Sequence, residues 1–100
     1  MTLEIKKDNE TVTGLLKGRL DNASVTSFTE SIQPLMAYTN KHIILDFSGL
    51  QFISLSGIRL IQSLQNATKR NGGYMSIRNV AVTVMQLFTA TGVAAFLDIE

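Results

Sequence analysis

One stretch near the middle of the chain constrains the fold more than any other. Ile43–Phe47 is a β-branched, apolar run of strand length, too continuous for a half-exposed strand. Ser48–Gly49 interrupts it, and apolar residues then recur at helical spacing at Ile58, Ile61 and Leu64. This pattern predicts a buried strand, a short loop and an amphipathic helix.

The predicted helix opens on serines. Ser54 suits the N-cap, because its oxygen can accept a hydrogen bond from an unpaired backbone N–H, and Ser56 then lies in the first turn. A phosphate on Ser56 would be tolerated at this positively polarised end and would add about two negative charges. Gly57 would let another protein approach closely. The alternative, which spacing alone favours, is that both serines only cap the helix.

Leu55 lies between the two serines and allows two interpretations. It is either an exposed apolar residue that suits partner docking beside a phosphoacceptor, or it folds back onto the sheet as a staple. The residue types do not choose between the two.

Two strands and a long helix are predicted before this stretch. Leu3–Lys6 alternates apolar and polar residues, and Thr11–Leu20 resumes strand character after a turn, so a hairpin is the economical pairing. A helix is expected over Ala23–Thr39, and Pro34 should kink it after its second turn. The intervening Asp21–Asn22 pair either faces a ligand at the carboxyl end of a strand or, by preference, caps the helix.

The remaining elements complete an alternating pattern. Tyr74–Arg78 is predicted as a strand, Asn79 as the N-cap of a helix over Val80–Thr89, and Phe96–Ile99 as a short last strand or an extended tail. The order β-β-α-β-α-β-α-β implies right-handed crossovers and an antiparallel first strand. We expect one α/β domain over residues 1–100, with a mixed, mostly parallel sheet of four to five strands and about three main helices.

Composition excludes several classes of function. Nine basic and eight acidic residues give a net charge of +1, without a basic cluster, so no nucleic-acid partner is expected. No apolar run is long enough to insert in a membrane, and the N-terminus lacks the core of a signal peptide, which indicates a cytoplasmic protein.

Side chains that could act in catalysis or bind a metal ion are scarce. There is no cysteine, and His42, at the start of a strand, is the single histidine, interpreted as a solvated imidazole, so neither a metal site nor a cofactor is expected. Asp21 and Asp46 could lie near the same sheet edge, but Asp46 is better interpreted as a strand-end residue that bonds backbone N–H groups. Weak nucleotide binding at the Gly57 helix start stays open.

Four motifs in the right order carry a resemblance to a known family. They are Gly18–Asp21, Ile44–Leu50, Phe52–Ile58 and Thr91–Phe96. With these motifs the chain resembles the STAS domain, as found in bacterial anti-sigma factor antagonists. Spacing and order agree over nearly the full length, so a STAS-like fold is expected.

The resemblance implies a phosphorylation switch at Ser56. In such antagonists an anti-sigma factor that is also a serine kinase phosphorylates the serine before the glycine, the unmodified antagonist binds that factor, and a serine phosphatase resets the system. The expected contact face comprises the residues around this serine: Asp21, Asn22, Ser54, Leu55, Gly57 and Arg59. Arg59 could pair with a phosphate three residues away on the same helix face.

The sequence departs from the family pattern beside the phosphoacceptor. Ser54 replaces the family's aspartate, and Leu55 replaces the first of two serines. These changes favour a first rival, a STAS-like accessory subunit of a transport or signalling complex without phosphorylation. A small enzyme on the same scaffold is a second rival, which the poor set of catalytic side chains disfavours.

Overall fold

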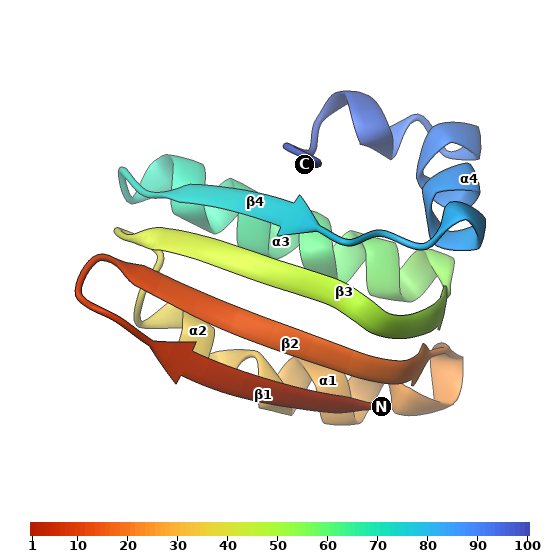
Figure 1. The fold of residues 1–100 in the computed structure, drawn as a ribbon, viewed down its shortest axis with the longest axis horizontal. Helices are drawn as coiled ribbons and strands as arrows, with labels where there is room; N and C mark the ends of the chain where they lie inside the picture. The colour runs from red at the N-terminus through yellow and green to blue at the C-terminus, as the bar shows by residue number, and fades with distance from the viewer.

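A four-stranded sheet with the order β1-β2-β3-β4 organises the chain (Figure 1), which the computed structural model describes over residues 1–100. The strands are β1 (Thr2–Lys7), β2 (Thr11–Leu20), β3 (His42–Ile53) and β4 (Tyr74–Arg78). β1 runs antiparallel to β2, whereas β2, β3 and β4 are mutually parallel. The predicted hairpin, the antiparallel first strand and the mixed, mostly parallel α/β sheet are confirmed.

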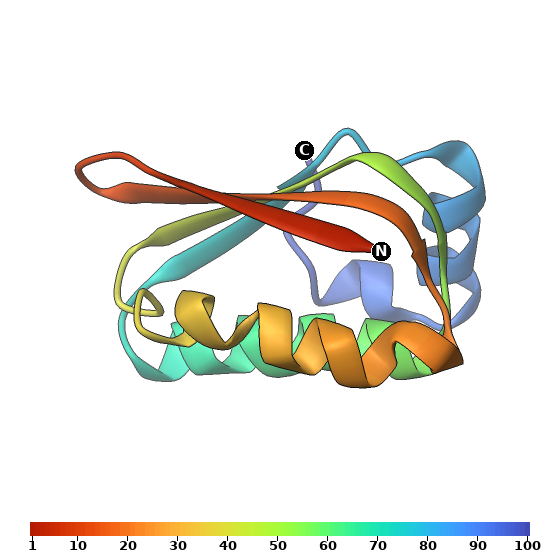
Figure 2. The ribbon, with the colours of Figure 1, turned by 90° about the horizontal axis from the view of Figure 1, so that it is seen from below.

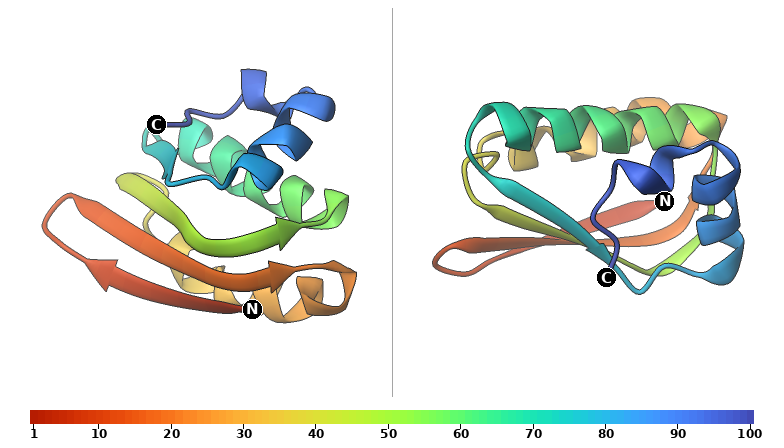
Figure 3. Two further views of the ribbon diagram at one scale, coloured as in Figure 1. Left: turned by 45° about the vertical axis from the view of Figure 1, so that its right-hand side comes forward. Right: turned by 90° about the horizontal axis from the view of Figure 1, so that it is seen from above.

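The longer helices lie on one face of this sheet. Figures 2 and 3 show α1, α2 and α3 packed side by side against that face, with α4 at the end of the sheet where α3 begins. The helical elements are η1 (Asn22–Ser24), α1 (Val25–Ser31), α2 (Gln33–Met36), α3 (Leu55–Arg70), α4 (Val82–Ala90) and η2 (Val93–Ala95). None of these helices combines the length and the apolar character that crossing a bilayer requires.

The core fills the space between the sheet and these helices. Strand side chains alternate between the two faces of the sheet. Near Ile44 both faces of β3 are buried, and consecutive residues of the strand are therefore apolar there. Alternate strand residues meet an apolar stripe on α3, and together they form the centre of the core: Val12, Leu16, Ile43, Leu45, Phe47, Ile58, Ile61 and Leu64. The amphipathic period predicted for α3 is confirmed.

The helix expected over Ala23–Thr39 is broken rather than kinked. α1 ends at Ser31, and α2 begins at Gln33 with Pro34 in its first turn. Because proline has no N–H to donate to the preceding turn, the chain restarts as a separate short helix.

The interruption expected at Ser48–Gly49 does not occur. β3 continues to Ile53 through two irregularities, since Leu15 lies opposite Asp46 while Lys17 lies opposite Gly49. β3 therefore contains extra residues relative to β2, and these bulges bend the strand without ending it.

The segment after β4 also differs from its prediction. Asn79 adopts a left-handed conformation with φ of 61°, and its amide donates to Asp46 Oδ1 at 3.2 Å, so it does not cap a helix. α4 begins instead at Val82, after Ala81. The last residues form an extended tail joined to β4 by one bridge, between Ile77 and Ile99.

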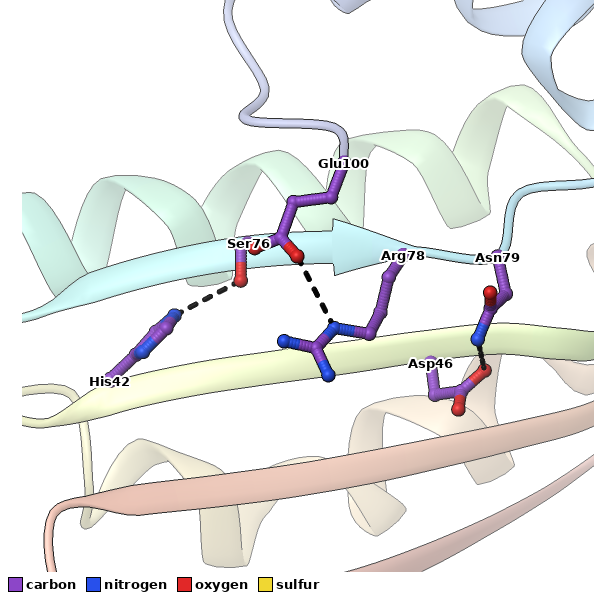
Figure 4. A network of polar contacts seen from close by, with 6 residues as sticks. All are labelled: His42, Asp46, Ser76, Arg78, Asn79 and Glu100. Carbon is purple, nitrogen blue, oxygen red and sulfur yellow. Dashed lines mark hydrogen bonds and ion pairs between the residues drawn. The ribbon is translucent and has the colours of Figure 1, made fainter.

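The face of the sheet opposite α1–α3 carries a polar network (Figure 4). His42 Nε2 lies 3.0 Å from Ser76 Oγ, and the Arg78 guanidinium lies 3.4 Å from a carboxylate oxygen of Glu100. His42 is half-buried and packs against Tyr74, with ring centroids 4.9 Å apart, so it is not the solvated imidazole expected. The C-terminal tail is held against β4 by main-chain hydrogen bonds, from the Ile77 N–H to the Asp98 carbonyl at 2.8 Å and from the Glu100 N–H to the Ile77 carbonyl at 2.7 Å, beside the Arg78–Glu100 ion pair.

The environment of the Asp46 carboxylate predicts a small pH dependence of the free energy of unfolding. Partial burial raises the pKa of Asp46, but hydrogen bonds from the Ser48 backbone and the Asn79 amide, with the Arg78 charge, lower it by more, so its pKa lies below the ordinary value. A lowered pKa stabilises the fold above about pH 4, and this stabilisation is lost as the pH falls through the lowered pKa. Asp46→Asn should therefore lower the free energy of unfolding at pH 7 by no more than about 1 kcal/mol, because the carboxylate is only partly buried and solvent screens its interactions. Urea denaturation of wild type and Asp46→Asn at pH 7 and pH 2.5 checks this prediction. The difference between their free energies of unfolding should be smaller at pH 2.5.

Candidate functional site at the start of α3

The ends of β2 and β3 bring two loops together. Leu20 and Ile53 are paired at the end of the sheet, and the Ser54 N–H donates to the Leu20 carbonyl at 2.7 Å. Asp21 follows Leu20 directly, so the Asp21–Asn22 segment lies beside the start of α3. Figure 3 shows this end of the sheet with the beginnings of η1 and α3.

Ser54 is the N-cap of α3, as predicted. Its backbone is extended, with φ of −84° and ψ of 168°, and its Oγ accepts a hydrogen bond from the Gly57 N–H at 3.2 Å. The first turn of α3 contains no acidic residue, so no side-chain carboxylate offsets the positive end of the helix dipole.

Removing this cap should destabilise the protein measurably. Ser54→Ala leaves the Gly57 N–H without its partner, and we expect a loss of about 1 kcal/mol in the free energy of unfolding. Ser63→Ala is the matched control, since Ser63 is exposed on the same helix and bonds only the Arg59 carbonyl. Urea denaturation measures both, and equal effects of the two substitutions would contradict the capping role.

Ser56 is exposed on the first turn of α3. Its hydroxyl makes no hydrogen bond within the chain, whereas those of Ser54 and Ser63 on the same helix do. Arg59 is also exposed one turn further on and has no ion-pair partner, because the single ion pair of the structure joins Arg78 and Glu100. The site thus combines a free hydroxyl, a positive helix end and an uncompensated cation.

The two neighbours of Ser56 have opposite environments. Leu55 is 52% exposed, so it is an exposed apolar residue and does not fold back onto the sheet as a staple. Gly57 is buried, and a Cβ atom there would lie 2.8 Å from Leu20 Cγ and 3.0 Å from Ile53 Cγ1. The absence of a side chain at Gly57 therefore lets α3 pack against the ends of β2 and β3. The prediction that Gly57 opens the surface to a partner is wrong.

Of the predicted Asp21–Asn22 pair, Asp21 serves as the helix cap. Asp21 Oδ1 accepts from the Ser24 N–H at 3.1 Å, and the Asp21 N–H donates to Ser24 Oγ at 3.0 Å, which is a capping box. The Ser24 hydroxyl, donating at 3.0 Å, is the largest cause of the lowered pKa of Asp21. Asn22 is exposed as the first residue of η1.

Asp46 does not join this site. It lies opposite Leu15, six residues before Asp21, so about 20 Å along the strand direction separates the two carboxylates. The pair of carboxylates expected near one sheet edge is therefore not formed. In the whole structure, no three His, Cys, Asp or Glu side chains gather in a way that could hold a metal ion.

Sequence reasoning missed one exposed apolar residue at this end of the molecule. Val82, the first residue of α4, is 74% exposed. The signal was available, because the buried residues of α4 are Val84 and Phe88, whose spacing places Val82 off that stripe. Val82 and Leu55 give this end of the molecule two exposed apolar side chains.

The mixed sheet with its longer helices on one face agrees with a family model that covers almost the whole chain. A model of the STAS domain matches residues 2–100. The chain therefore belongs to the STAS domain family. None of the curated proteins matches the sequence at a significant level.

Solved structures of similar fold include several antagonists of anti-sigma factors. An anti-sigma factor antagonist from Mycobacterium paratuberculosis has a TM-score of 0.85 at 12% identity, over 99% of this chain and 84% of that one. The unphosphorylated anti-sigma factor antagonist SpoIIAA has a TM-score of 0.79 at 23% identity, over 99% and 88%. The murine anion transporter Slc26a9 has a TM-score of 0.76 at 19% identity, over 90% of this chain and 15% of the transporter. At these identities the likeness establishes the fold.

Proposed function

We propose that this STAS domain is an anti-sigma factor antagonist that acts by binding rather than catalysis. Its partner is an anti-sigma factor with serine kinase activity, which binds the unmodified protein and releases it once Ser56 is phosphorylated. A serine phosphatase restores the binding form, and the system operates in the cytoplasm. The likeness to SpoIIAA, which has been solved in both phosphorylated and unphosphorylated forms, supports this proposal.

One observation carries the proposal: the exposed Ser56 hydroxyl has no partner within the chain and lies at the positive end of α3. A kinase needs such an accessible hydroxyl, and the helix end tolerates the added phosphate. Leu55 beside it is an apolar contact for the partner, and the charge placed next to Leu55 by phosphorylation opposes burial of that contact.

The alternative is a STAS subunit that binds a larger assembly without phosphorylation. The Ser54 and Leu55 departures support it, because Ser54 uses its oxygen to cap α3 and leaves no carboxylate beside Ser56. The transporter likeness is consistent with STAS folds inside larger proteins.

Capture from native lysate with immobilised wild type, Ser56→Ala and Ser56→Asp tests the proposal. Wild type and Ser56→Ala should retrieve a protein with a serine kinase domain, and Ser56→Asp should lose it. Ser63→Asp is the matched control, because it places the same charge on an exposed position of the same helix and should keep the partner. Identical retrieval by all four proteins would favour the alternative.

A further inference from the structure

The outer edge of β1 is unpaired. β1 is the first strand in the order β1-β2-β3-β4, and Figure 1 shows it as the outermost strand on its side of the sheet. None of the turn, loop or cap hydrogen bonds involves the main chain of residues 2–7, so these residues bond only within the ladder with β2. A row of N–H and C=O groups therefore has no partner within the chain, and such a row can pair with a strand of another molecule.

The ladder with β2 indicates which residues present these groups. Hydrogen-bonded and non-hydrogen-bonded pairs alternate in an antiparallel ladder. The Asp8 N–H donates to the Thr11 carbonyl at 2.8 Å beside the turn, and the pairing continues in the same register along β1. The even-numbered residues of β1 therefore direct their N–H and C=O groups to β2. The odd-numbered residues direct theirs to the free edge: Leu3, Ile5 and Lys7.

The side chains of β1 separate onto the two faces of the sheet. Leu3 and Ile5 are partly buried and pack against the core. Glu4 and Lys6 lie on the opposite face, where both are exposed. Neither makes an ion pair, because the single ion pair of the structure lies between β4 and the C-terminal tail. The edge strand thus carries two uncompensated charges of opposite sign, two residues apart.

This charge pattern is complementary to itself in one antiparallel register. With Ile5 opposite Ile5 of a second copy, Glu4 lies opposite Lys6 of that copy, and the same pair occurs twice by symmetry. A shift of two residues in either direction places Glu4 opposite Glu4 or Lys6 opposite Lys6, and like charges directly opposite destabilise a sheet. A shift of one residue places apolar side chains opposite charged ones on the wrong face. One register therefore combines matched faces with two attractive charge pairs.

We propose that two copies of this chain associate through β1 in this register and form one eight-stranded sheet. The free main-chain groups of β1 supply the hydrogen bonds, and the two Glu4–Lys6 pairs set the register. The two-fold symmetry reverses the strand direction between copies, so the two Ser56 sites lie at opposite ends of the joint sheet. The contact does not involve Ser56, and it does not depend on the proposed function.

Sedimentation equilibrium of the full chain at low ionic strength tests the association. We expect a monomer–dimer equilibrium with a Kd of about 1–1,000 µM, as for a small interface. Glu4→Lys and Lys6→Glu should each weaken association about tenfold or more, because each turns two attractive pairs into two repulsive ones. The double variant Glu4→Lys/Lys6→Glu should restore the Kd to within about threefold of wild type, because the pairs are then exchanged.

Lys69→Glu is the matched control for the charge reversals. Lys69 is exposed on α3, away from β1, and this substitution changes the net charge as Lys6→Glu does. Its Kd should equal that of wild type.

Disulfide cross-linking tests the register, because the chain contains no cysteine. Glu4 and Lys6 of the second copy form a non-hydrogen-bonded pair, whose Cα atoms lie about 4.5 Å apart, a separation that a disulfide can span. A mixture of the Glu4→Cys and Lys6→Cys proteins should therefore form mixed disulfides several-fold faster than either protein forms disulfides alone.

Three results would overturn the proposal. The first is a monomer at every concentration up to about 1 mM. The second is a double variant that associates as weakly as the single charge reversals. The third is disulfide formation that is no faster in the mixture than in either protein alone.

Discussion

Ser56→Asp is expected to lower the affinity for the captured kinase partner about 100-fold, or about 2.7 kcal/mol. The proposed interface buries Ser56 together with the exposed Leu55, and a carboxylate placed there loses its water without gaining a partner charge. Ser56→Ala should bind within about twofold of wild type, because the hydroxyl makes no hydrogen bond within the chain. Isothermal titration calorimetry with the purified partner measures all three affinities.

The same substitutions separate loss of binding from loss of folding. A carboxylate at Ser56 lies in the first turn of α3, where the helix dipole stabilises negative charge by about 0.3–1 kcal/mol. Ser56→Asp should therefore be as stable as wild type or slightly more stable, and Ser63→Asp should bind normally. A Ser56→Asp protein that binds as tightly as wild type would contradict the interface.

Gly73→Ala is expected to lower the free energy of unfolding by about 3 kcal/mol or more. A Cβ atom at Gly73 would lie 2.1 Å from the Thr39 carbonyl oxygen and 2.6 Å from the Lys41 carbonyl oxygen. Both are main-chain atoms, held because the Tyr74 N–H donates to Lys41 and Asn71 Nδ2 to Thr39 Oγ1. Neither carbonyl can move without disturbing the turn between α3 and β4.

Gly72→Ala is the matched control for this prediction. A Cβ atom there would meet nothing within 4 Å, although φ of 80° makes alanine strained by roughly 1–2 kcal/mol. Urea denaturation of both variants should show the larger loss at Gly73. Equal losses would mean that the close approach of the Thr39 and Lys41 carbonyls does not limit position 73.

The elements that sequence reasoning located are those fixed by local pattern. The apolar residues Ile43–Leu45 mark β3 because both faces of the strand are buried there, and the stripe of Ile58, Ile61 and Leu64 marks α3. Ser54 could be assigned as an N-cap because capping depends on residues three positions apart.

The features that were missed depend on contacts between distant segments. Ser48–Gly49 looks like a break, but pairing with β2 carries the strand through it as a bulge. Asn79 looks like a cap, but its amide bonds Asp46, thirty-three residues away. Gly57 looks like an opening for a partner, but Leu20 and Ile53 fill the space beside it. No local pattern contains this information.

Phosphate transfer to Ser56 is the most direct measurement of the proposed switch. The captured partner, ATP and Mg²⁺ are incubated with the full chain, and peptide mass spectrometry locates the phosphate before the product is tested for binding. We expect the phosphate on Ser56 alone and loss of binding by the product. A phosphate on Ser54 or elsewhere, no phosphate at all, or a phosphorylated protein that still binds would contradict the account.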